Sequence, residues 1–282
     1  MNPADIPDQP LRVALVQINA GRDSKVNLDW LEAALPKAGA CDLITLPELC
    51  AMRGGDDDYR TSAETLDGPL ATWFATLART RRVWLLVGSL VERTPEGLYN
   101  TSLLFDPDGA RVGVYRKIHL FEAHLDDGRT ILESDLWRAG DHPVLAEIAG
   151  WRCGLSICYD LRFPELYRHY AELGAHLLCV PSNFTQRTGR DHWELLLRTR
   201  AVENQAFVVA PDQCGANSVT GIESHGHSTA IGPWGELLAM AGDAAGVTLV
   251  TLDPELLKIT RARVPALEHR RFVIVPPGGT GG

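Results

Sequence analysis

The stretch that decides the fold is Trp151-Arg152-Cys153-Gly154-Leu155-Ser156-Ile157-Cys158-Tyr159-Asp160-Leu161-Arg162-Phe163-Pro164-Glu165-Leu166. Residues 152–157 are typical of a buried strand, and Pro164 is typical of the first turn of a helix, because proline there loses no hydrogen bond. Cys158 is therefore expected on the bend between strand and helix. Backbone N–H groups near a helix start favour negative charge, and they favour a cysteine thiolate over the thiol.

Cys158 also fits a second interpretation. Most cysteines at the end of an apolar strand are inert core residues, and the spacing of this stretch by itself favours that interpretation. The choice between a core cysteine and a nucleophile therefore depends on residues elsewhere in the chain.

The composition indicates a globular protein that binds neither nucleic acid nor a membrane. Of the 282 residues, 45% are hydrophobic and 22% are charged, and 27 Lys and Arg against 36 Asp and Glu give a net charge of −9. No block of basic residues is present for phosphate binding. No apolar run reaches the length of a membrane span, and residues 1–10 lack the features of a secretion signal. We expect a cytoplasmic protein.

The cysteines and histidines indicate neither a disulfide framework nor a metal site. No two of the six cysteines form a C-x-x-C pair, so free thiols in a reducing compartment are expected. His225 and His227 have no third ligand at a metal-binding spacing, and local hydrogen bonds explain them better. We expect no metal.

Strand and helix patterns alternate along the chain. Buried strands are predicted at residues 12–17, 42–46, 83–90, 152–157, 176–180 and 207–210, a hairpin at 99–115, and helices at 69–80, 164–173, 191–203 and 254–264. Asn27 is expected to cap a further helix, Val202 to face the core, and strands 228–231 and 247–252 to form a closing hairpin. Because no linker divides the chain, we expect one α/β domain over residues 11–272, between an N-terminal extension at 1–10 and a flexible Pro- and Gly-rich tail at 273–282.

Two further polar residues follow predicted strands. Glu48 follows strand 42–46 and Lys117 follows the hairpin, so both are expected at the edge where open α/β sheets hold their ligands. Taken singly, each is better explained as a surface side chain. Together with Cys158 they supply a nucleophile, a carboxylate that accepts and returns its proton, and a cation for an oxyanion. No histidine is placed comparably for a Cys–His protease.

Five segments of the chain match the motifs of a known family. They are Leu46-Pro47-Glu48, Tyr115-Arg116-Lys117-Ile118-His119-Leu120-Phe121, Ile157-Cys158-Tyr159-Asp160-Leu161-Arg162-Phe163-Pro164-Glu165, Thr188-Gly189-Arg190-Asp191-His192-Trp193-Glu194, and Gly226-His227-Ser228 with Pro233-Trp234-Gly235. On these segments the chain resembles the nitrilase superfamily of carbon–nitrogen hydrolases, in its Nit-type amidase branch. The resemblance extends from Leu11 to about Arg271.

The resemblance implies a four-layer αββα sandwich and an amidase that needs no metal or organic cofactor. It implies that Glu48 is the general base, that Lys117 stabilises the oxyanion and that Cys158 is the nucleophile. Glu133, in the long polar segment 122–140, is implied to be a second active-site glutamate that orients the substrate amide or Lys117. The resemblance also implies a homodimer or a higher homo-oligomer.

We expect a thioester mechanism on a small amide that carries a distal carboxylate. The backbone N–H of Tyr159 is the expected second oxyanion donor, and Arg162, Phe184 and Thr185 are the expected substrate contacts, with Arg162 binding the carboxylate. Two loop arginines, Arg129 and Arg187, are further candidates at the same mouth.

Arg162 equally fits an ion pair with Asp160 or Glu165 that holds the bend.

Several substrates and one non-catalytic role stay open. In the Nit-type branch the candidates are ω-amides of α-keto dicarboxylic acids and deaminated glutathione, while N-carbamoyl amino acids and nitriles would use the same three groups. Residues 214–225 lack an arginine that many relatives carry before Gly226-His227-Ser228, so the exact substrate stays open. An inactive scaffold that acts through a partner interface is the alternative of another class, and the intact set of reactive groups argues against it.

Overall fold

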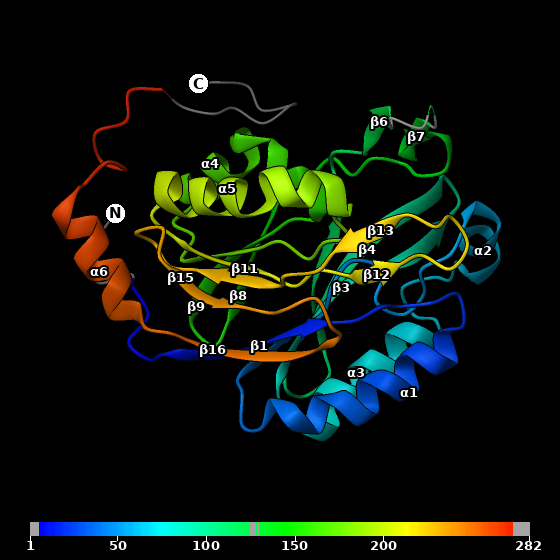
Figure 1. Cartoon of the computed structure of the whole chain (residues 1–282). Coiled ribbons are helices and arrows are strands. Elements are labelled where there is room, and N and C mark those ends of the chain that lie inside the picture. Colours follow the sequence, from blue (N-terminus) through cyan, green and yellow to red (C-terminus); the bar gives the residue numbers. More distant parts are fainter. Residues whose placement is uncertain (1–5, 125–127, 129, 273–282) are drawn as a thin grey trace.

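The computed structural model describes residues 6–124, 128 and 130–272, so the tail 273–282 and part of the N-terminal extension lie outside the described residues. Within this part, two six-stranded sheets pack face to face between two helical layers (Figure 1). Helices α1 (Ser24–Ala34) and α3 (Pro69–Arg81) cover one sheet, and α4 (Pro164–Glu172) and α5 (Gln186–Asn204) cover the other. The predicted four-layer αββα sandwich is confirmed.

Each sheet combines parallel and antiparallel strands. The first has the order β16 (Gly246–Leu252), β1 (Leu11–Gln17), β2 (Leu43–Thr45), β3 (Trp84–Thr94), β4 (Gly97–Phe105) and β5 (Arg111–Arg116). The second has the order β15 (Leu237–Met240), β14 (Thr229–Ile231), β11 (Phe207–Ala210), β10 (Leu177–Cys179), β9 (Trp151–Leu155) and β8 (Val144–Ile148). The strands β1, β2 and β3 run parallel, as do β9, β10 and β11.

The remaining elements are short or lie at the margins. They are α2 (Asp56–Ser62), α6 (Pro254–Arg263), the hairpins β6 (Glu122–His124) with β7 (Thr130–Leu132) and β12 (Cys214–Ala216) with β13 (Glu223–His225), and the 3-10 turns η2 (Leu35–Ala38), η3 (Glu133–Asp135) and η4 (Cys158–Arg162). No helix among the described residues is both long enough and apolar enough to cross a bilayer.

The apolar strands are continuous because both of their faces are buried. In β1, Val13 and Leu15 pack in the core between the two sheets, whereas Ala14 and Val16 pack in the core beneath α1 and α3. Successive side chains of a strand point to opposite faces, so a strand covered on both faces reads as one apolar run rather than an alternating one. On α5, Trp193, Leu197 and Ala201 recur at four-residue spacing and are buried.

Two predictions about single helix residues were wrong. Asp23 rather than Asn27 caps α1, because Asn27 is buried inside the helix, where its amide donates to the carbonyl oxygens of Gly21 and Ala51. Val202 is 51% exposed, since it lies off the buried face of α5.

The predicted closing hairpin also differs. Strand β14 pairs with β15, while β16 pairs with β1 in the other sheet. A hairpin therefore does form around Pro233-Trp234-Gly235, but its second strand is β15, and the chain crosses to the other sheet between Met240 and Gly246.

Several further elements were not predicted, and one began earlier than predicted. The unpredicted elements include α2, β8, β15 and the hairpins β6–β7 and β12–β13. Helix α5 begins at Gln186 because the Thr185 hydroxyl accepts a hydrogen bond from the Thr188 N–H.

A close backbone contact places the turn that carries Glu48. At Gly88 of β3, an added Cβ would lie 2.1 Å from the carbonyl oxygen of Leu46 and 2.3 Å from that of Pro47. The next residue, Ser89, accepts a hydrogen bond from the Leu49 N–H at 2.9 Å. The turn after β2 therefore sits directly against β3, and only glycine leaves room for it.

Gly88→Ala is expected to lower the free energy of unfolding by about 1–3 kcal/mol or more, because the new methyl group overlaps rigid backbone atoms. Denaturant titration of the wild type and the variant measures the change. Gly246→Ala is the matched control, since Gly246 also lies in a strand but has open space around its Cα. Equal midpoints for Gly88→Ala and Gly246→Ala would contradict the proposed contact.

Candidate active site

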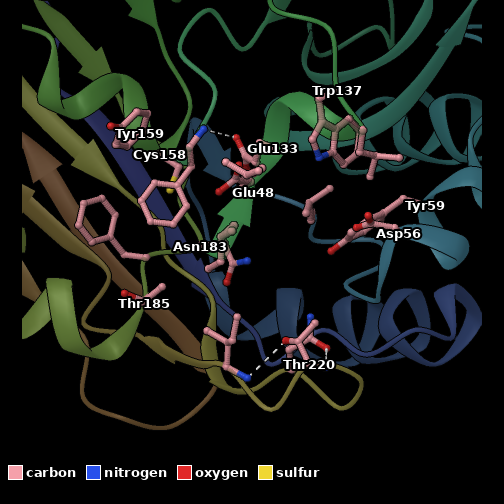
Figure 2. A pocket seen from close by; sticks show the side chains of 18 of the residues that line it. Glu48, Asp56, Tyr59, Glu133, Trp137, Cys158, Tyr159, Asn183, Thr185 and Thr220 are labelled. Atoms are coloured by element: carbon pink, nitrogen blue, oxygen red, sulfur yellow. Dashed lines mark hydrogen bonds between the residues drawn. The ribbon is translucent and has the colours of Figure 1, made fainter. Parts of the chain in front are cut away.

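A cavity of about 420 Å³ opens where loops from both sheets meet. Figure 2 shows Glu48 and Glu133 in its middle, Cys158 and Tyr159 on one side, and Trp137, Tyr59 and Asp56 on the other. The convergence follows from the strand directions, because β2, β5 and β9 all end at this edge of the sandwich. Residues that follow these strands therefore reach one space although they lie far apart in the chain.

Glu48 follows β2 and is almost completely buried. Its side chain is 3% exposed, and its Oε1 atom accepts a hydrogen bond from Asn100 Nδ2 at 2.7 Å and one from Lys117 Nζ at 3.0 Å. Gln213, which follows β11 of the other sheet, donates to the Glu48 carbonyl oxygen at 2.9 Å. Both the carboxylate and the backbone of Glu48 are thereby held in place.

Lys117 lies between two carboxylates. Its ammonium group is 1% exposed and lies 3.0 Å from Glu48 Oε1 and 2.9 Å from Glu133 Oε2. Burial by itself lowers the pKa of Lys117, but the neighbouring Glu133 and Glu48 carboxylates outweigh it and raise the pKa well above the usual value. Lys117 is therefore a permanent cation in the cavity.

Glu133 is the first residue of η3 and directly follows β7. Its Oε2 atom accepts a hydrogen bond from the Phe121 N–H at 2.7 Å, and its side chain is 19% exposed. Burial raises the pKa of Glu133, while Lys117 opposes this rise. Glu133 thus lies against the cation rather than in solvent.

Cys158 is the first residue of η4, on a strained bend that follows β9. Its φ of 48° lies in the left-handed region, which residues other than glycine rarely adopt. Its N–H donates to the Pro181 carbonyl oxygen at 2.9 Å. Burial and the nearby Glu48 raise the pKa of the thiol well above its usual value, although Lys117 and the Asn183 N–H lower it. The sequence led us to expect a stabilised thiolate, but burial outweighs the effect of the turn, so the resting group is a thiol.

A buried carboxylate holds this bend. Asp160 accepts hydrogen bonds from the Tyr115 hydroxyl at 2.7 Å, from the His119 N–H at 3.0 Å and from the Ile157 N–H at 2.9 Å. Tyr115 and His119 flank Lys117 in the chain. Asp160 therefore ties the segment that carries the cation to the bend that carries the thiol.

The predicted substrate contacts line the same cavity. Tyr159, Arg162, Phe184 and Thr185 all belong to its wall. The Arg162 guanidinium lies 5.5 Å from the centre of the Phe184 ring and 3.4 Å from His192 Nδ1. Arg162 forms no ion pair with Asp160 or Glu165 among the described residues, so the expected pairing is not what holds the bend.

The two loop arginines that were expected at the mouth of the cavity are Arg187 and Arg129. Arg187 is exposed on the first turn of α5 and does not belong to the described wall of the cavity. Arg129 lies outside the described residues.

Several residues around the site were missed by sequence reasoning. Asn100, Asn183 and Gln213 act on Glu48 or Cys158 through hydrogen bonds. Single asparagines and glutamines carry no spacing signal, so only their position next to the reactive groups identifies them. His225 and His227 stack on each other at 4.6 Å, and no group of metal-binding side chains occurs among the described residues.

The chain matches the carbon–nitrogen hydrolase family over residues 12–262. It is 36% identical over 272 residues to the deaminated glutathione amidase of Synechocystis sp., covering 94% of this chain and 100% of that protein. It is 34% identical over 276 residues to the chloroplastic omega-amidase of Arabidopsis thaliana, covering 94% of this chain and 74% of that protein.

The fold of the chain is also similar to that of a solved structure. The crystal structure of Saccharomyces cerevisiae Nit3, a member of branch 10 of the nitrilase superfamily, superposes with a TM-score of 0.83 at 31% identity, covering 95% of this chain and 98% of that one. The predicted resemblance is confirmed. The chain therefore belongs to the carbon–nitrogen hydrolase family and is an enzyme of the amidase type.

Proposed function

We propose that this amidase hydrolyses a small, carboxylated amide to a carboxylic acid and ammonia through a thioester on Cys158. The observation that carries the proposal is Lys117, a buried cation that bridges Glu48 and Glu133 in the cavity that Cys158 also lines. A thiol, a proton acceptor and a fixed positive charge then surround one small space.

In the first half of the reaction, the Cys158 sulfur attacks the amide carbon while the thiol proton passes to the Glu48 carboxylate. The carbonyl π electrons move to oxygen, and Lys117 and the Tyr159 N–H stabilise the oxyanion. Collapse of this intermediate breaks the C–N bond. The proton on Glu48 goes to the leaving nitrogen, which departs as ammonia.

In the second half, Glu48 takes a proton from water as the water oxygen attacks the thioester carbon. The C–S bond breaks, and the proton returns to the Cys158 sulfur. The sum is amide plus water to carboxylic acid plus ammonia. The raised pKa of the Cys158 thiol supports this scheme, because a neutral thiol needs a base at the moment of attack.

Arg162 is our candidate for binding a distal carboxylate of the substrate. It lies in the cavity wall over the Phe184 ring, where a guanidinium can bind a carboxylate through two hydrogen bonds. Relatives named deaminated glutathione amidase and omega-amidase support a carboxylated amide. The cavity of about 420 Å³ also admits an acyl group larger than acetyl.

We further propose a homo-oligomeric, cytoplasmic enzyme. Leu195 is 65% exposed and Val202 is 51% exposed on the outer face of α5, and apolar side chains gathered on one helix support a subunit contact. All six cysteines are free and lie in the described part of the chain, as in proteins of reducing compartments.

Cys158→Ala is expected to abolish ammonia release from succinamate, the half-amide of succinic acid, while the melting temperature stays close to wild type. Cys41→Ala is the matched control, because Cys41 is equally exposed at 8% but does not line the cavity. Iodoacetamide should modify Cys158 before the other five cysteines, because Glu48 accepts the thiol proton as the sulfur attacks, and Glu48→Gln should therefore slow this alkylation. Turnover by Cys158→Ala would overturn the proposed mechanism.

Glu133→Gln is expected to lower kcat by about 100-fold and also to lower the free energy of unfolding, because the amide keeps the shape of the side chain but loses a charge that neutralises the buried Lys117. Steady-state kinetics with succinamate measure the effect. Glu122→Gln, an exposed glutamate in the neighbouring strand β6, should leave kcat unchanged. Similar rates for the two variants would return Glu133 to the class of ordinary loop glutamates.

Arg162→Leu is expected to lower kcat/KM for succinamate by about 10- to 100-fold, the usual effect of losing a charged hydrogen bond. Turnover of 4-methylpentanamide, in which an isopropyl group replaces the carboxylate, should not fall. Arg187→Leu serves as the control, because Arg187 is exposed outside the described cavity wall. Equal losses for both amides would contradict the role of Arg162 in carboxylate binding.

A further inference from the structure

We propose that Asn100 is a positioning residue that holds the Glu48 carboxylate so that Oε2, and not Oε1, receives the proton of the Cys158 thiol. The proposal rests on the proposed role of Glu48 as the general base. It assigns a task to a residue outside the cavity wall, and it distinguishes the two oxygen atoms of the base.

Two donors converge on one oxygen of Glu48. Asn100 Nδ2 lies 2.7 Å from Oε1, and Lys117 Nζ lies 3.0 Å from the same atom. Oε2 takes part in no hydrogen bond or ion pair with the described residues. An oxygen that already accepts two charged or short hydrogen bonds is the poorer proton acceptor. The free oxygen of a carboxylate that lines the cavity with Cys158 is therefore the one left for the thiol proton.

The backbone of Asn100 reinforces this arrangement. Asn100 lies in β4, is 1% exposed, and its carbonyl oxygen accepts the Lys117 N–H at 2.9 Å. One residue therefore holds the carboxylate with its side chain and the start of the lysine segment with its main chain. Any shift of Asn100 would move both groups relative to each other.

The oxygen of the Asn100 amide indicates that this residue acts through its N–H donor. Its Oδ1 atom is buried and has no hydrogen-bond partner among the described residues. A buried acceptor without a partner costs stability. Rotating the amide does not remove this cost, because it would place Oδ1 against the Glu48 carboxylate. An apolar side chain would avoid the cost altogether, so the asparagine is explained by its single donation to Oε1.

The hydrogen bond from Asn100 to Glu48 should affect how activity depends on pH. Loss of the donor favours the protonated form of the Glu48 carboxyl group, so activity should begin to fall at a higher pH on the acid side. The titratable groups that face Glu48 are Lys117, Cys158, Glu133, Tyr59 and Asp212. All of them are kept in the variants below, so a shift reports the missing donor.

The test is the pH profile of kcat/KM for succinamate in wild type, Asn100→Leu and Asn204→Leu. Asn204 is the matched control, because it is also buried and donates through Nδ2 to the Arg200 carbonyl oxygen at 2.9 Å. Its Oδ1 also lacks a partner within the described part of the chain, but Asn204 lies at the end of α5. Asn100→Leu should move the acid limb upward by about one pH unit and lower kcat about tenfold, with KM unchanged. Asn204→Leu should leave the limb in place.

Asn100→Val, which suits a strand, provides a second variant where leucine disturbs folding. An acid limb that stays in place in a folded Asn100 variant, or that moves equally in Asn204→Leu, would overturn the proposal. Glu48→Gln separates this outcome from failure of the proposed function. If Glu48→Gln keeps its activity, Glu48 is not the base. If Glu48→Gln is inactive but the limb of Asn100→Leu does not move, only the role of Asn100 is lost.

Discussion

The structure depends on a buried ammonium group that must be neutralised. Removing a charge from water is costly unless partners of opposite charge and hydrogen bonds replace the solvent. Lys117 meets this demand with Glu48 and Glu133, which come from different segments. The turn after β2, the end of β5 and the segment after β7 are therefore required to converge. The same requirement assembles the cavity in which the proposed reaction takes place.

The surrounding structure fixes the position of Cys158 but does not ionise its thiol. The left-handed φ of Cys158 raises the energy of the bend, and Asp160 compensates by bonding the bend to Tyr115 and His119. Burial meanwhile keeps the thiol neutral. A neutral thiol is protected until a base acts on it, so the burial that stabilises the fold also makes the proposed chemistry depend on Glu48.

The two sheets are joined at the cavity by polar contacts as well as by the apolar core. Gln213, after β11, donates to the Glu48 carbonyl oxygen and accepts the Ala20 N–H at 3.0 Å. Arg53, fully buried, donates to Ser224 Oγ at 2.6 Å and to the Ala20 carbonyl oxygen at 3.1 Å, and burial lowers its pKa. These directional contacts set the register of one sheet against the other, which apolar packing by itself does not do.

The sequence by itself determined the α/β class, most strands and helices, and the candidate reactive residues Glu48, Lys117 and Cys158. These features are local, because a buried strand, a helix start or a family motif depends on residues that are close together in the sequence. The resemblance supplied the four-layer arrangement, which periodicity does not contain.

Only the tertiary structure decided features that depend on residues far apart in the chain. The state of the Cys158 thiol depends on burial, which a motif does not show. Strand β16 pairs with β1 of the other sheet instead of forming the expected hairpin, and this pairing joins residues too far apart in the chain for local sequence to specify. Asn100 and Gln213 were invisible in the sequence, since a single amide acquires its role only from the atom that folding places beside it, here a carboxylate or a carbonyl oxygen of Glu48.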